Sequence, residues 1–171
     1  MKRILVYLIL CFASIGGFSQ GKIIHTDLIV LRGEIKNPQN ITMATLAEFK
    51  AKDLNDVTNY NHLGEAHGMY KSVKGILLKD VLQKVQLNMT SPKQLYGFYV
   101  ECTATDGYKT VFTWNELMNT PNGENIFIVT ARDGKDMANL DDRIAILQLA
   151  EPGKGHLNIK AVQQITILSV K

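Results

Sequence analysis

Apolar and polar residues alternate along several short stretches of this chain, and this pattern predicts a domain built mainly of β-strands. Turn-forming residues separate the stretches, as is usual between paired strands. We expect strands at 27–35, 55–62, 68–73, 96–104, 108–113, 125–131, 144–149 and 162–170. The stretch 63–66 is expected to join the second strand to the third as a hairpin, and the glycine-containing stretch 151–155 is expected to be a flexible loop.

Helical spacing occurs in only a few places. Thr42 or Thr45 is suited to cap a short helix whose Leu46 and Phe49 face the core. A second helix is predicted to open at Gly75, because Ile76, Leu77, Val81, Leu82 and Val85 recur near helical spacing. A third is expected at 114–118, after a turn at Asp106-Gly107. Many strands and few helices, with no repeated strand–helix–strand order, predict an α+β fold.

The first nineteen residues have the pattern of a secretory signal peptide. Lys2 and Arg3 precede an apolar stretch, and Gly17 and Ser19 place small residues before a cleavage that would leave Gln20 at the new N-terminus. We therefore expect a signal peptide at 1–19, one domain at 20–171, and a periplasmic or secreted protein. A retained membrane anchor and a lipid-modified Cys11 are the alternatives, but the apolar stretch is short for either.

Charge excludes one class of partner. The sequence has 19 basic and 16 acidic side chains, and removal of Lys2 and Arg3 leaves 17 against 16. There is no basic run with interleaved aromatic residues, so we expect no nucleic-acid partner. Outside the leader no apolar stretch has the length of a membrane span, so we also expect no stable membrane insertion.

Cys102 is the one cysteine that remains after cleavage. It lies in an alternating strand with Val100 and Ala104 on its face, which predicts a buried and unreactive thiol. Intermolecular disulfide formation would require this thiol to be exposed.

Several segments together resemble a known family. They are the strand, proline turn and leucine-bearing helix of 31–49, Gly75-Ile76-Leu77-Leu78 with Asp80-Val81-Leu82, Asp106-Gly107-Tyr108, Arg143-Ile144-Ala145-Ile146-Leu147 and Ile159-Lys160-Ala161-Val162. In this order they are similar to segments of the molybdopterin-binding catalytic domain of sulfite oxidases and related bacterial reductases. The resemblance covers most of 28–170. It implies a mixed-sheet α+β fold with a few short helices, a molybdopterin cofactor, and a redox or membrane partner protein.

One residue of the family's pattern is missing. Members of the family hold molybdenum through a cysteine ahead of the helix that begins Gly-hydrophobic-x-Leu. The corresponding segment here, 57–75, contains no cysteine, and Cys102 lies on the other side of the helix. We therefore expect no cysteine ligand to molybdenum, which puts oxygen-atom transfer in doubt, whereas binding of a pterin or another anion remains open.

The candidate site consists of cations near the C-terminal strand. Arg143, Lys154, His156 and Lys160 lie close in sequence around Gly153 and Gly155, and phosphate groups are bound by such cations together with backbone N–H donors. In the family, a basic residue in the position of Lys160 contacts the pterin phosphate. The alternative interpretation is that these residues are solvated charges on a loop.

A second group of polar residues lies in the hairpin turn. His62, Glu65 and His67 are residue types that bind zinc, copper or iron when they converge. Their spacing matches no known helical zinc motif, so the prediction is that they are turn residues and that no metal is bound. His62 alone is a further candidate to approach the bound ligand, because it lies in the segment where the family has its cysteine. Asp106 and Tyr108 are both acid–base residue types, but the turn explains Asp106, and Tyr108 is as suited to packing as to reacting.

Three functions from different classes follow from these observations. The first is an exported binding protein that takes a pterin-type or other small anionic ligand without molybdenum redox catalysis. The second is a periplasmic molybdopterin-dependent oxidoreductase subunit. The third is a protein-interaction module with a vestigial pocket.

Overall fold

The computed structural model describes residues 24–61, 63–151 and 154–170. The predicted signal peptide and its cleavage site lie outside these residues, as does His62. Within the described part of the chain, no helix has both the length and the apolar character that crossing a bilayer requires.

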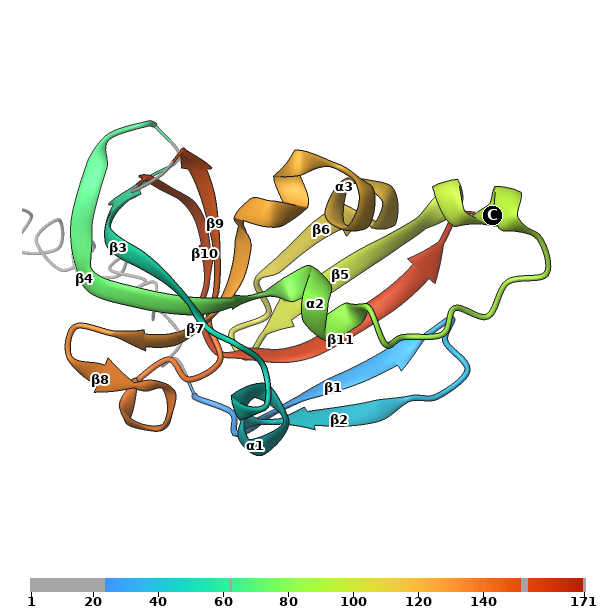
Figure 1. Ribbon diagram of the computed structural model, residues 1–171, viewed down its shortest axis with the longest axis horizontal. Helices are drawn as coiled ribbons and strands as arrows, with labels where there is room; N and C mark the ends of the chain where they lie inside the picture. Colours follow the sequence, from blue (N-terminus) through green and yellow to red (C-terminus); the bar gives the residue numbers. More distant parts are fainter. Residues whose placement is uncertain (1–23, 62, 152–153, 171) are drawn as a thin grey trace, which may run out of the picture.

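Strands form most of the structure (Figure 1). The strands are β1 (Leu28–Gly33), β2 (Gln39–Thr42), β3 (Lys52–Tyr60), β4 (Ala66–Leu77), β5 (Phe98–Ala104), β6 (Lys109–Thr113), β7 (Ile126–Arg132), β8 (Lys135–Asp136), β9 (Ile146–Glu151), β10 (Lys154–Ile159) and β11 (Val162–Ser169). The α-helices are α1 (Met43–Ala47), α2 (Leu78–Leu82) and α3 (Trp114–Asn119), and 3-10 helices occupy Pro92–Gly97, Pro121–Asn125 and Met137–Asn139.

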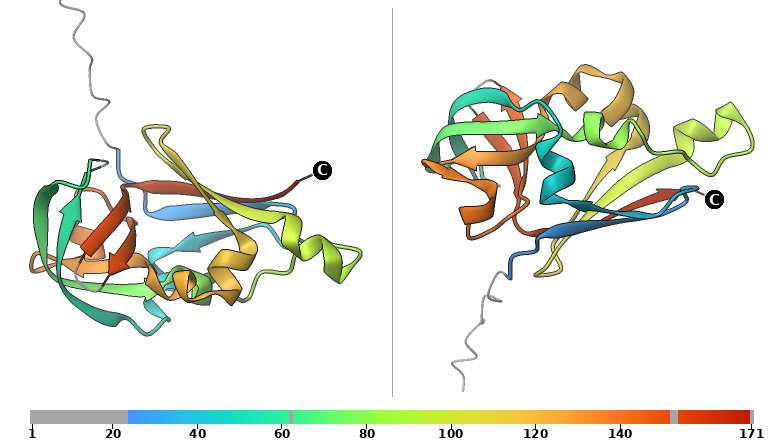
Figure 2. Two further views of the ribbon diagram at one scale, coloured as in Figure 1. Left: turned by 90° about the horizontal axis from the view of Figure 1, so that it is seen from above. Right: turned by 60° about the horizontal axis from the view of Figure 1, so that its bottom comes forward.

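The first sheet is mixed and has the strand order β2-β1-β11-β5-β6. β1 pairs with β11 in parallel, whereas the other pairs are antiparallel. The helices α2 and α3 lie on the same side of this sheet, and no helix of the described residues lies on its opposite face (Figure 2, left). Strands β1 and β11 are far apart in sequence, so this sheet forms only when the two ends of the domain meet.

The second sheet curls into a small barrel. Its strand order is β4-β3-β10-β9-β7-β8, and an additional pairing of β4 with β7 closes the ring. Closure satisfies the backbone groups that open sheet edges would expose. Figure 1 shows the barrel on the left and the five-stranded sheet on the right.

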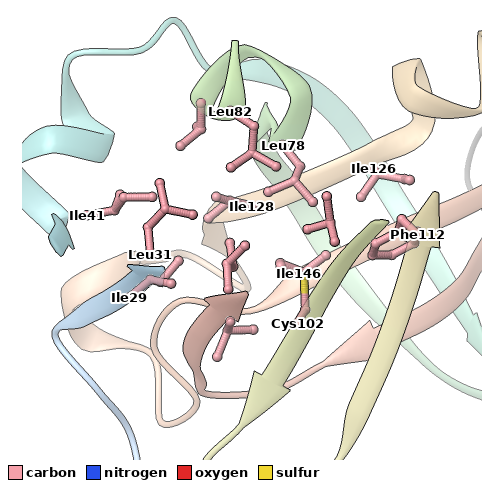
Figure 3. Close-up of a cluster of buried hydrophobic side chains, with 14 of the residues drawn as sticks. Ile29, Leu31, Ile41, Leu78, Leu82, Cys102, Phe112, Ile126, Ile128 and Ile146 are labelled. Atoms are coloured by element: carbon pink, nitrogen blue, oxygen red, sulfur yellow. The ribbon is translucent and has the colours of Figure 1, made fainter. Parts of the chain in front are cut away.

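Two hydrophobic clusters fill the molecule. The larger lies between the five-stranded sheet and the barrel, and includes Ile29, Ile146 and Ile165. The smaller fills the barrel around Val57 and Leu147. The larger cluster contains Cys102, which is fully buried with its sulfur among aliphatic side chains (Figure 3). The prediction of a buried cysteine is confirmed.

The predicted helix at Gly75 is wrong at its start. β4 continues through Gly75 to Leu77, and α2 begins only at Leu78. The continuing strand pairs with β7, where Gly75 lies opposite Val129 and Leu77 opposite Phe127. Pairing with a distant strand therefore overrides the local helical spacing.

The loop predicted at 151–155 is also partly wrong. Lys154 and Gly155 belong to β10, which pairs antiparallel with β9 and in parallel with β3. By contrast, the hairpin between β3 and β4 and the turn at Asp106-Gly107 are present as predicted. Of the two proposed caps, Thr42 is the residue that caps α1, because its side chain accepts a hydrogen bond from the Thr45 amide.

Candidate functional site

The chain segments that carry Arg143 and Lys160 lie side by side where the two sheets meet. The Ala161 amide donates to the Asp142 carbonyl at 3.2 Å, and the Val162 amide donates to the Ile144 carbonyl at 3.0 Å. We call this region the junction and define it as Thr105, 142–144 and 160–162. Thr105 belongs to it because its amide donates to the Ala161 carbonyl at 3.0 Å. The fold thus places the backbone segments of two of the predicted cations side by side.

Two residues of the junction have an unfavourable backbone conformation. Ile144 has φ = 57° and Ala161 has φ = 50°, and both are fully buried. Residues other than glycine rarely adopt positive φ, and a β-branched residue there is a genuine outlier. Such a conformation costs about 1–3 kcal/mol of folding free energy per residue, and residues that adopt it cluster at functional sites. Packing and backbone hydrogen bonds hold the junction in this conformation.

Three buried polar atoms of the junction have no hydrogen-bond partner among the described residues. They are Thr105 Oγ1, Asp142 Oδ2 and Arg143 Nε. Buried polar groups almost always have a hydrogen-bond partner. Each of these three atoms could therefore form a further hydrogen bond. Arg143 Nε is a hydrogen-bond donor, Asp142 Oδ2 is an acceptor, and the Thr105 hydroxyl can be either. The junction therefore offers both donors and acceptors to a ligand.

The charges of the junction are partly compensated. Arg143 Nη1 donates to Asp27 Oδ1 at 2.6 Å, and the arginine side chain is 27% exposed. Lys160 is exposed. Asp27 is the more exposed partner, at 61%, so this ion pair is accessible to solvent and to a competing anion. Thr26 ties the same N-terminal segment to β11 through its hydroxyl, which donates to the Val162 carbonyl at 3.0 Å.

A buried polar network adjoins the junction on the barrel side. Asp142 Oδ1 accepts from Arg132 Nη2 at 2.6 Å, and the Arg132 guanidinium lies 4.4 Å from the centre of the Tyr70 ring. The Tyr70 hydroxyl accepts from Asn158 Nδ2 at 2.7 Å. Burial raises the pKa of Tyr70, so its hydroxyl stays protonated at neutral pH.

The other predicted site residues are not all at the junction. Lys154 begins β10 and Lys160 directly follows its last residue, so the two lie six residues apart, which corresponds to about 20 Å along an extended strand. Lys154 lines a separate hollow of about 480 Å³ together with Tyr60, Asn61 and Gly155. His156 belongs to β10, but its side chain is outside the described part of the structure, as is His62 altogether.

Glu65 and His67 of the hairpin turn are two of the candidate metal ligands named from the sequence. Glu65 Oε2 accepts from Asn61 Nδ2 at 3.0 Å, and the backbone amides of Leu63 and Glu65 donate to Asn61 Oδ1. The described residues contain no group of three or more histidine, cysteine, aspartate or glutamate side chains able to hold a metal ion. Glu65 therefore acts in the structure as a turn residue, and His67 is exposed on β4.

Asp106 and Tyr108 also have a structural explanation. Asp106 Oδ1 accepts from the Tyr108 amide at 2.9 Å, which is the hydrogen bond of a turn between β5 and β6. The Tyr108 side chain is half exposed at the surface.

The thiol does not fit a molybdenum cofactor of the family's type. Such a cofactor requires a thiolate that reaches the metal, whereas Cys102 is fully buried in the apolar core. Burial raises the pKa of this thiol to about 12, with a smaller contribution from Glu101, so it is protonated at neutral pH. The described residues of the β3–β4 hairpin contain no cysteine.

The network around Arg132 was not found by sequence reasoning. Arg132, Asp142, Tyr70 and Asn158 come from four segments with no shared motif. The only local signal is the cluster Asp141-Asp142-Arg143, which shows that charges gather there but not which of them become buried.

Comparisons with known proteins bear on the fold. No protein-family model matches the sequence, and no curated protein matches it. Among solved structures, the sulfane dehydrogenase SoxCD from Paracoccus pantotrophus is similar, with a TM-score of 0.60 and 11% sequence identity. The match covers 86% of this chain and 40% of that chain, so the present chain spans less than half of the dehydrogenase chain. The predicted fold class, a mixed-sheet α+β fold of the sulfite-oxidase molybdopterin-domain type, is confirmed.

Proposed function

We propose that this protein is an exported binding module that takes a small anionic ligand, such as a phosphorylated pterin, at the junction. The observation that carries the proposal is that two cations, Arg143 and Lys160, lie on adjacent backbone segments whose residues Ile144 and Ala161 are strained. These two strained residues are fully buried and lie beside buried polar atoms without a hydrogen-bond partner among the described residues, and backbone strain clusters at functional sites.

The chemistry of the junction suits a phosphate-bearing ring. An arginine forms paired hydrogen bonds with phosphate oxygens, and an exposed lysine adds a compensating charge. The Asp27 carboxylate accepts a hydrogen bond from the Arg143 guanidinium. An anionic ligand would therefore replace this carboxylate or bind beside it. If the junction opens locally, the second oxygen of Asp142 would accept from an N–H group of a pterin ring, and the hydroxyl of Thr105 would donate to its carbonyl.

The proposal includes no molybdenum redox chemistry. A metal held only by the sulfurs of its pterin would lack the protein thiolate that the family uses, and Cys102 is sealed in the core. The ligand would therefore be bound, carried or sensed rather than oxidised. Export rests on the pattern of residues 1–19, and the ligand would be met in the periplasm or outside the cell.

A calorimetric titration with a pterin monophosphate, pyrophosphate and inorganic phosphate tests this function. We expect saturable binding of at least one of the three by the chain without its leader. Lys160→Ala should weaken that binding by about 1.5 to 3 kcal/mol, because a charge-assisted hydrogen bond is lost. Arg143→Gln should have a similar effect.

Lys93→Ala is a matched control, because Lys93 is an exposed lysine in the 3-10 helix at Pro92–Gly97, away from the junction. This variant should bind with unchanged affinity. Lys154→Ala tests whether the far end of β10 takes part, and the separation along the strand predicts no effect. Absence of binding by the parent, or equal affinity in the parent and in both junction variants, would remove the anion site and favour the interaction-module hypothesis.

A further inference from the structure

A second hollow, independent of the junction, lies between β2, α1 and the end of α2. It has a volume of about 260 Å³ and is walled by residues of 37–41, 45–49 and 81–86. These segments come from two different parts of the chain, and backbone hydrogen bonding joins them nearby, where the Lys36 amide donates to the Gln86 carbonyl at 2.8 Å. The hollow thus lies between two chain segments that are hydrogen-bonded to each other.

Carboxamides dominate its rim. Asn37, Gln39, Asn40 and Gln86 all line the hollow, and no side-chain hydrogen bond within the described residues engages any of them. Each carboxamide offers two N–H donors and a carbonyl acceptor without net charge. Four of them around one hollow form a surface that can donate and accept at the same time.

The floor of the hollow is apolar and contains an aromatic ring. Ile41 and Val81 are buried, and the half-buried Phe49 contributes its ring. The Lys84 ammonium lies 5.5 Å from the centre of that ring, within the range of a cation–π interaction. A ligand here would meet an apolar surface below and neutral hydrogen-bonding groups around its edge.

We propose that this hollow binds a single-ring polyhydroxylated ligand of the monosaccharide class. Hydroxyl groups donate and accept, as carboxamides do, and the C–H face of a sugar ring matches an apolar floor with an aromatic side chain. The volume supports one ring, because pockets for larger ligands begin at about 300 Å³. A strongly anionic ligand is disfavoured, because Lys84 is the one cation in this lining and is already engaged with Phe49.

The test is an NMR titration of the folded chain with D-glucose, D-galactose and N-acetyl-D-glucosamine, each up to about 50 mM, since affinities in the millimolar range are expected. We expect saturable shifts for at least one probe in the side-chain amides of Asn40 and Gln86. Asn40→Ala and Gln86→Ala should each weaken binding at least about threefold, because each removes two donors and an acceptor.

Gln83→Ala provides the matched control, because Gln83 is an exposed carboxamide at the end of α2 that does not line the hollow. Its affinity for the probe should equal that of the parent. The proposal is overturned if no probe gives saturable shifts, or if binding occurs and neither Asn40→Ala nor Gln86→Ala weakens it. Both variants alter exposed side chains, so folding is retained and the result is interpretable.

Discussion

Asp142 and Arg132 form an ion pair of 2.6 Å whose side chains are only 6% and 11% exposed. The pair links β7 to the segment that begins the junction, and through Tyr70 it reaches β4 and β10. Two charges taken out of water in this way stabilise the protein only as long as both are present. The pair therefore fixes the position of the strained segment at Ile144.

Replacing Arg132 with methionine should destabilise the protein strongly. The Asp142 carboxylate would keep its burial and lose its only hydrogen-bond donor among the described residues. Removing one partner of a buried ion pair typically costs about 3 to 5 kcal/mol. Urea unfolding followed by circular dichroism measures the loss.

Lys109→Met is the control for this prediction. Lys109 forms an ion pair with Glu101 at 3.0 Å, but its side chain is 55% exposed, and such pairs contribute about 0 to 1 kcal/mol. The double variant Arg132→Met, Asp142→Leu should lose less than the sum of the single variants, because no unpaired charge stays buried. Equal losses for Arg132→Met and Lys109→Met would contradict the structural role of the buried pair.

Gly33 should tolerate no side chain. It ends β1 with φ = 109°, and a Cβ there would lie 2.0 Å from the Ile167 carbonyl oxygen of β11. Gly33→Ala should therefore destabilise by about 3 kcal/mol or more, from positive φ and from a backbone clash.

Gly107→Ala isolates the conformational part of that effect. Gly107 has φ = 86°, but a Cβ added at this position would have no heavy atom within 4 Å. The substitution should therefore cost only backbone strain, about 1 to 2 kcal/mol. Thermal unfolding of both variants gives the comparison, and a Gly33→Ala loss as small as that of Gly107→Ala would argue against the close approach of β1 to β11.

The helix predicted at Gly75 shows where sequence pattern misleads. Ile76 and Leu77 are neighbours and both are buried, which resembles a helix face. In the structure they point to opposite sides of one strand, Ile76 into the larger cluster and Leu77 into the barrel. A strand that is buried on both faces no longer alternates between apolar and polar residues. Only knowledge of the second hydrophobic cluster would therefore have distinguished a strand from a helix at this position.

The candidate site could be predicted only in part, because long-range strand pairing decides which of its residues lie close together. Arg143 and Lys160 were predicted because they lie close in sequence to Gly153 and Gly155 and because Lys160 matches a basic position of the family, and the fold places their backbone segments side by side. Lys154 was grouped with them because its glycine neighbours resemble a turn, whereas β10 carries it away from Lys160. The position of β10 in the barrel depends on its parallel pairing with β3, a long-range contact that no local pattern encodes.

The purified protein should contain no stoichiometric molybdenum. The thiolate that the family uses is missing from 57–75, and Cys102 cannot reach solvent without opening of the core. Elemental analysis of the purified protein, with Cys102→Ser as the comparison, measures the metal. About one molybdenum per chain would contradict the prediction, and a content that fell in Cys102→Ser would show a role for this thiol.

The stability of the protein should fall at alkaline pH because of Cys102. In the folded state, burial raises the pKa of this thiol to about 12, whereas in the unfolded chain it loses its proton near pH 8.5 to 9. Between these values the unfolded state binds fewer protons than the folded state, so rising pH favours unfolding. The stabilisation is complete below about pH 8.5 and is lost as the pH rises toward 12.

Urea unfolding at pH 8 and pH 10.5 tests this, with Cys102→Val as the matched control because valine packs in a strand and does not ionise. Lysine and tyrosine side chains also titrate in this range, but they do so in both proteins. The parent should lose about 2 kcal/mol more than Cys102→Val between the two pH values, from a slope of about 1.4 kcal/mol per pH unit above the unfolded pKa. Parallel pH profiles, or rapid labelling of the native thiol at pH 8, would show that Cys102 is not held protonated in the core.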